Sequence, residues 1–186
     1  MTNREPIPTA LGQPTARVQS GSALEEEAFR GWYERTLPRV YAYLLNRCGR
    51  NVDLAEELTQ QTFVDALRSR RGAVASQRAE WMIGVARHKL VDYFRGLERR
   101  ENGFLRLVAG RPPQSISMDE TGPDDRVSIA LTRLPAAQRA AVVLRYVDDL
   151  PVREVARLLG RSESSAESLL SRARAALRQQ LSEDPQ

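Results

Sequence analysis

The sequence contains very few of the residues on which metal and redox chemistry depend. It has one cysteine, Cys48, and one histidine, His88, in 186 residues. A single cysteine excludes an internal disulfide and a cysteine-rich zinc site, and a single histidine excludes most histidine-based metal and acid–base sites. The sequence also lacks a glycine-rich phosphate loop and a Ser–His–Asp set. We therefore expect no catalytic residues, no metal and no cofactor, and we do not expect an enzyme.

Long apolar runs are also missing. No segment approaches the roughly 18 apolar residues that a membrane-spanning helix needs, so we expect no membrane association. The first ten residues, MTNREPIPTA, lack a basic stretch followed by an apolar one, which argues against a secretory signal. These features predict a cytoplasmic protein of one or two small domains.

Lysine is nearly absent: Lys89 is the one lysine among the 28 cationic side chains, and the others are arginine. Arginine makes planar bidentate contacts with phosphate and guanine that lysine cannot make. A net charge of +4 and a sequence pI near 9.7 favour an anionic partner, nucleic acid before membrane. A genome whose base composition favours arginine codons is the alternative explanation of the count alone.

Hydrophobic periodicity predicts helices and no strands. The expected helices cover 22–47, 52–70, 78–100, 126–133, 135–147, 151–160 and 162–181. Ser22 with Glu25 forms a capping-box pattern at the first of them. Residues 1–21 are proline-rich and poor in large apolar side chains, which predicts a disordered tail. Glycine, proline and acidic residues interrupt 101–127, which predicts a flexible linker. The fold class is therefore all-α, with two small helical domains at 22–100 and 128–182.

The C-terminal block has the dimensions of a helix-turn-helix. A short helix begins at Pro151, a turn follows at Gly160-Arg161-Ser162, and a longer helix begins at Glu163. The residues expected to pack are Ala166, Leu170, Ala173, Leu177 and Leu181. Small or polar residues occupy the opposite face, at Ser164, Ser165, Ser168 and Arg172. With nine arginines against five acidic residues over 131–182, the block favours duplex DNA over a helical hairpin packed on another protein.

The helix over 78–100 carries a second basic surface. Arg87, Arg95 and Arg99 recur at intervals of eight and four, so they share one face, which Lys89 and Arg100 widen. Trp81 at the start of this helix is either a platform on which unpaired bases stack or an ordinary core residue. The basic face favours nucleic acid, with solvated charge as the alternative.

The helix over 52–70 carries a polar stripe with one aromatic residue. Glu56, Gln60 and Phe63 are spaced at i, i+4 and i+7. The stripe is either a protein-binding face or a solvated helix whose Phe63 turns to the core, and composition does not separate the two. Adjacent carboxylates such as Asp148-Asp149 do not converge on one helix face, so we interpret them as surface charge.

Three segments together resemble bacterial RNA polymerase sigma factors of the extracytoplasmic-function group, in the sigma-70 family. They are LAEELTQQTFVDALR (54–68), AEWMIGVARHKLVDYFRGLERR (79–100) and LTRLPAAQRAAVVLRYVDDLPVREVARLLGRSESSAESLLSRARAALR (131–178). The resemblance implies that 22–100 is a sigma region 2 domain and 128–182 a region 4 domain. It implies a factor that binds core RNA polymerase and directs promoter-specific initiation, reading duplex −35 DNA and melted −10 DNA, and that is often held by an anti-sigma factor.

The resemblance also implies site residues. Contacts with the clamp helices of the polymerase's largest subunit would come from Glu56, Glu57, Leu58, Gln60 and Phe63. Contacts with the −10 element would come from Trp81, Arg87, Lys89, Arg95 and Arg99, with the loop at 71–78 capturing a flipped base. Contacts with the −35 element would come from Ser164, Ser165, Glu167, Ser168, Arg172 and Arg174.

The last helix departs from the family pattern at two positions. Glu167 and Leu169 stand where the family usually has basic residues, while Arg172 and Arg174 remain. A carboxylate repels phosphate but accepts from cytosine N4, so we expect unusual −35 contacts. Two other readings stay open: a stand-alone helix-turn-helix regulator, which leaves the first domain unexplained, and a helical adaptor, against which the arginine faces count.

Overall fold

A computed structural model describes residues 16–70, 78–107 and 125–182, and in these ranges the chain is helical without a strand. The elements in order are α1 (Ala16–Arg47), α2 (Val52–Arg70), α3 (Ala79–Leu107), α4 (Asp125–Thr132), α5 (Ala136–Val142), the π-helical turn η2 (Val143–Val147), α6 (Val152–Leu159) and α7 (Glu163–Ser182). The prediction of an all-α fold is confirmed. No helix in the described ranges is long and apolar enough to cross a membrane.

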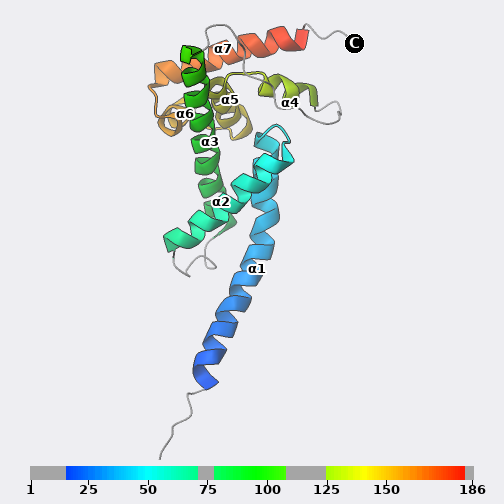
Figure 1. Cartoon of the computed structure of the whole chain (residues 1–186), viewed down its shortest axis with the longest axis vertical. Coiled ribbons are helices and arrows are strands. Elements are labelled where there is room, and N and C mark those ends of the chain that lie inside the picture. The colour runs from blue at the N-terminus through cyan, green and yellow to red at the C-terminus, as the bar shows by residue number, and fades with distance from the viewer. Residues whose placement is uncertain (1–15, 71–77, 108–124, 183–186) are drawn as a thin grey trace, which may run out of the picture.

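The N-terminal domain consists of α1, α2 and α3, which pack against one another (Figure 1). The chain turns between α1 and α2 through Gly49 and Arg50, both with positive φ, and the side chain of Asn51 accepts the N–H of Leu54 to cap α2. The helix α1 begins at Ala16 and passes through Pro38. Ser22 therefore lies inside α1 and does not cap it, so the predicted start was wrong. Residues 1–15 lie outside the described ranges.

The C-terminal domain consists of α4 to α7, with the helix-turn-helix formed by α6 and α7. Gly160 ends α6 in the left-handed conformation with φ of 63°. Ser162 caps α7, because its Oγ accepts the N–H of Ser165 at 3.2 Å. Both boundaries agree with the sequence pattern. The helix predicted over 135–147 instead divides into α5 and the turn η2.

The two domains touch along α3, which rises from α2 to α5 and α6 (Figure 1). Buried side chains from both domains, including Phe94, Leu134 and Leu158, belong to one hydrophobic cluster. The helix α3 continues to Leu107 and does not end at residue 100, so the first residues of the predicted linker are helical. The carboxylate of Glu101 accepts the N–H of Ala136, at 3.1 Å for the nearer oxygen, and so caps α5 from the other domain. The remainder of the predicted linker, 108–124, lies outside the described ranges.

Candidate nucleic-acid and protein interfaces

The basic face predicted on α3 exists, but the C-terminal domain covers part of it. Arg87 donates through Nε to the carboxylate of Asp148 at 2.8 Å. Arg95 donates through Nη2 to the carbonyl of Leu158 at 2.6 Å. Arg87 and Arg95 therefore lie on one side of α3, as their spacing predicts, and both contact the other domain. Arg99 is exposed.

Asp148 is the centre of a cluster that the sequence did not reveal. Its carboxylate is fully buried and accepts from Arg47 Nε at 2.6 Å, Arg87 Nε at 2.8 Å and the Tyr43 hydroxyl at 2.8 Å. We call these four residues the Asp148 cluster. The interpretation of Asp148 as surface charge was wrong, although its neighbour Asp149, with a side chain 96% exposed, fits that interpretation.

The backbone explains why the two carboxylates separate. Asp148 directly follows the π-helical turn η2, and Asp149 has a positive φ of 52°. With these irregular conformations the Asp148 side chain points towards α1 and α3, whereas the Asp149 side chain lies in solvent beside Arg145. The arginine partners of Asp148 are distant in sequence, so periodicity within a helix cannot predict them.

The electrostatics of the Asp148 cluster favour a charged Arg87 and a neutral Tyr43. Burial lowers the pKa of Arg87, but the hydrogen bond to Asp148 and the charges around it more than offset this and raise the pKa above its usual value. Burial first, and then Asp148, raise the pKa of Tyr43 far above its usual value, so its hydroxyl remains a donor. The Arg47 guanidinium also lies 3.7 Å from the centre of the Tyr43 ring.

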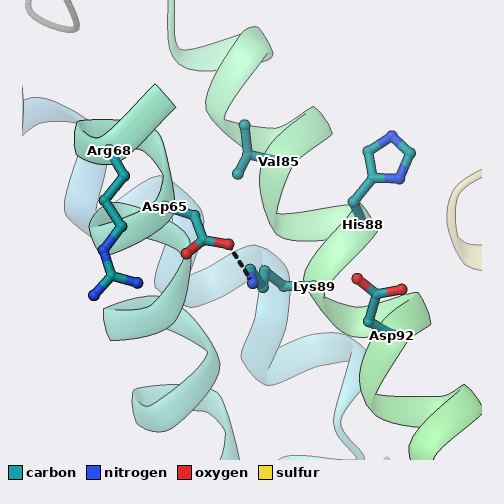
Figure 2. A pocket seen from close by; sticks show the side chains of 6 residues that line it. All are labelled: Asp65, Arg68, Val85, His88, Lys89 and Asp92. Atoms are coloured by element: carbon teal, nitrogen blue, oxygen red, sulfur yellow. Dashed lines mark ion pairs between the residues drawn. The ribbon is translucent and has the colours of Figure 1, made fainter. Parts of the chain in front are cut away.

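An adjoining side of α3 borders an open cleft with a volume of about 500 Å³. Asp65 and Arg68 of α2, with Val85, His88, Lys89 and Asp92 of α3, line the cleft (Figure 2). Lys89 reaches across it to form an ion pair with Asp65 (Figure 2). The exposed His88 received no role from the sequence. Trp81 is half-buried and packs against the hydrophobic cluster, which fits the core alternative.

The polar stripe on α2 divides into a buried part and an exposed part. Phe63 is 5% exposed, and its ring meets those of Trp32 and Tyr33 with centroids 5.6 and 4.9 Å apart. Leu58 is also buried. As a correction to the binding-face alternative, Phe63 is a core residue in this conformation. Glu56, Glu57 and Gln60 are exposed and form the accessible part of the stripe.

The polar face predicted on α7 is accessible. Ser164, Glu167, Ser168, Arg172 and Arg174 are exposed, and Ser165 is half-buried. Leu169 is 5% exposed and packs in the core, so the lack of a cation there does not alter the exposed face. The expected packing of Ala166, Leu170 and Ala173 is observed, whereas Leu181 is exposed.

Comparisons with known proteins cover both domains. The family model Sigma-70 region 2 matches residues 32–100, and Sigma-70, region 4 matches residues 125–177. The sigma factor CarQ of Myxococcus xanthus is 31% identical over 161 residues, covering 85% of this chain and 91% of CarQ. The extracytoplasmic-function sigma factor BldN of Streptomyces coelicolor is 31% identical over 179 residues, and the match covers 90% of this chain but 65% of BldN.

A solved structure supports the same fold. The sigma factor RpoE of Bartonella quintana, solved in complex with the anti-sigma factor NepR, aligns with a TM-score of 0.52 at 21% identity. The alignment covers 84% of this chain and 98% of RpoE. At this identity the likeness concerns the arrangement of the helices.

Proposed function

The chain belongs to the extracytoplasmic-function group of RNA polymerase sigma factors, which direct promoter-specific transcription initiation. From this we propose which surface of the chain binds the −35 DNA, the −10 DNA and the core polymerase. The observation that carries the proposal is that region 2 and region 4 are both matched, in that order, on two helical domains. A stand-alone helix-turn-helix regulator needs the C-terminal domain alone and receives no support. We assign no catalytic activity, because sigma factors act as DNA-binding initiation factors.

We assign duplex −35 recognition to the exposed face of α7. Short serine side chains at its N-terminal end allow the helix to lie deep in a major groove. Arg172 and Arg174 are exposed and supply positive charge for phosphates. Glu167 is exposed on the same surface, where it repels phosphate and accepts from cytosine N4. Its role is therefore selection among −35 sequences more than affinity.

We assign −10 recognition to α3 and the loop before it. Arg87, Lys89, Arg95 and Arg99 would contact the backbone of the melted strand, with Trp81 at the entry to the helix. The cleft between α2 and α3 offers His88 and Asp92 as hydrogen-bonding groups beside this path. Extruding a base costs a few kcal/mol, which contacts of this kind offset. The loop at 71–77 lies outside the described ranges.

We assign core polymerase binding to the exposed part of α2. Glu56, Glu57 and Gln60 would contact the polymerase, while the buried Leu58 and Phe63 hold α2 in place. Gln60→Ala should therefore weaken capture of core polymerase without lowering the melting temperature. Phe63→Ala should lower the melting temperature, because it leaves a cavity among aromatic rings.

Regulation by an anti-sigma factor is part of the proposal. The related RpoE was solved with such a partner, and a second protein that covers the domains of this chain would control its access to polymerase. We also propose that the protein acts in the cytoplasm, where the polymerase is found.

Two measurements test the proposed function. Purified protein is mixed with core RNA polymerase, with duplex DNA, and with neither, and complexes are separated by size. A sigma factor binds core polymerase without DNA, a repressor binds duplex DNA without polymerase, and an adaptor binds neither. Run-off transcription with core enzyme on a genomic promoter library then identifies its promoters, and a lack of transcripts above core enzyme alone would contradict the proposal.

A further inference from the structure

We propose that Asp148 is an internal substitute for a DNA phosphate: it holds the two domains closed and occupies an arginine that the −10 strand needs. The proposal rests on the proposed function, because it takes Arg87 to be a −10 contact. Its physical basis is the chemical likeness of the two acceptors. Carboxylate and phosphate oxygens form the same charge-assisted hydrogen bonds with a guanidinium group.

The Asp148 cluster ties the C-terminal domain to two helices of the N-terminal domain. Tyr43 and Arg47 belong to α1, Arg87 belongs to α3, and Asp148 follows η2. The Asp148 carboxylate is fully buried, and the side chain of Arg87 is only 28% exposed. A phosphate could not reach Arg87 Nε in this arrangement without displacing Asp148, so closure and −10 binding compete for one group.

In the closed arrangement, an arginine on each side of the interface that could contact DNA is already bound to the other domain. Arg95 donates to the carbonyl of Leu158 at the end of α6. In the other direction Arg161, in the turn of the helix-turn-helix, forms an ion pair with Glu98 of α3. The contact between α3 and α6 thus engages an arginine from each DNA-binding domain.

The ionic contacts of the interface add little net free energy to closure. The buried ions lose hydration on closing and regain it on opening, so their mutual attraction is largely offset by desolvation. Promoter DNA supplies phosphates for Arg87, and core polymerase, bound at α2, would hold the domains apart. Removing the Asp148 charge while leaving two arginines beside it should shift the population towards the open form.

The test compares two neighbouring carboxylates. Asp148→Asn removes the central charge of the cluster without changing its shape. Asp149→Asn is the matched control, because Asp149 is exposed and pairs with Arg145. Anisotropy measures binding to a fluorescent single-stranded DNA of about 15 nucleotides. This length covers one single-strand binding site. If the closed form holds about nine-tenths of the free protein, D148N should bind about tenfold more tightly and D149N should match the wild type.

A second measurement follows the opening itself. The radius of gyration from small-angle X-ray scattering should increase in D148N and remain unchanged in D149N. Cys48 supplies a chemical reporter, because it is buried near Arg139 of α5 and burial raises the pKa of its thiol to about 12. Its maleimide labelling should be slow in the wild type and in D149N, and faster in D148N.

Two further variants keep the proposal testable if D148N does not fold. Arg47→Gln weakens the cluster from α1 without altering Asp148 or Arg87, and Tyr43→Phe removes the hydroxyl that donates to Asp148. Both should shift DNA affinity and radius in the same direction as D148N, by smaller amounts. Circular dichroism establishes that each variant is folded.

The outcomes separate this proposal from the proposed function. An unchanged radius and unchanged DNA affinity in folded D148N and R47Q would overturn the Asp148 proposal. A larger radius with unchanged DNA affinity would overturn the claim that closure inhibits DNA binding. Promoter opening by the holoenzyme that is unaffected by Arg87→Ala would overturn the −10 assignment, whereas the scattering result reports closure independently. In the holoenzyme D148N and wild type should bind −10 DNA equally, because polymerase has already separated the domains.

Discussion

The two surfaces proposed to bind DNA, on α3 and on α7, differ in how they are built. On α7 the proposed contacts are exposed, apart from the half-buried Ser165, and the helix that carries them packs against its own domain. On α3 two of the proposed contacts, Arg87 and Arg95, are engaged by groups of the other domain. The surface on α7 is therefore available in the free protein, whereas the surface on α3 depends on the arrangement of the domains.

The sharpest test of the α7 surface compares neighbouring buried and exposed positions. Leu169→Lys restores a cation where the family usually has one, but Leu169 is buried, so the change should destabilise the C-terminal domain by about 3 kcal/mol or more. The exposed Ser168→Lys should alter stability by less than about 0.5 kcal/mol. Urea unfolding followed by circular dichroism measures both. Equal stability of the two variants would contradict the orientation of α7.

The difference between the α3 and α7 surfaces should also appear in stability. Arg87→Ala removes a partner of a buried carboxylate and should cost about 1–3 kcal/mol. Arg172→Ala removes an exposed side chain that donates to the carbonyl of Ser168, so its cost should stay below about 0.5 kcal/mol. Thermal melts of the two variants provide the comparison. Melting temperatures shifted by the same amount would show that Arg87 is not held as described.

The smallest expected effect concerns the selectivity of α7. Glu167→Lys replaces an exposed negative charge with a positive one, so non-specific duplex binding should tighten. The slope of log affinity against log salt should steepen by about one for each new phosphate contact. Discrimination among −35 sequences should fall if Glu167 accepts from a cytosine. Anisotropy titrations at two salt concentrations measure both effects, and Ser182→Lys at the far end of α7 is the control. An unchanged titration for Glu167→Lys would mean that this face does not meet DNA.

The features that the sequence predicted correctly are set by residues that lie close together in the chain. The helix-turn-helix, with Gly160 as its left-handed end and Ser162 as its cap, follows from residues adjacent in the chain. The buried positions Ala166, Leu170 and Ala173 on α7 follow from its period. These features needed no knowledge of the other domain.

The features that the sequence predicted wrongly or left open depend on contacts between distant residues. Asp148 was indistinguishable from Asp149 in the sequence, because the π-helical turn that buries one and exposes the other has no periodic signature. Glu101 was placed in a flexible linker, because its role as a cap for α5 requires the other domain. Phe63 fitted a surface stripe and a core equally well until the positions of Trp32 and Tyr33 were known.

The cap that Glu101 forms on α5 has a mechanical consequence. While the domains are closed, residues 101–107 form the last turns of α3, and Glu101 at their start is anchored by its contact with Ala136. Separation of the domains breaks that anchor and leaves the turns free to unwind. A residue advances about 1.5 Å in a helix and about 3.4 Å when extended. Unwinding residues 101–107 would therefore lengthen the connection between the domains by roughly 13 Å. The end of α3 can thus unwind and lengthen the connection between the two domains when they must span a promoter.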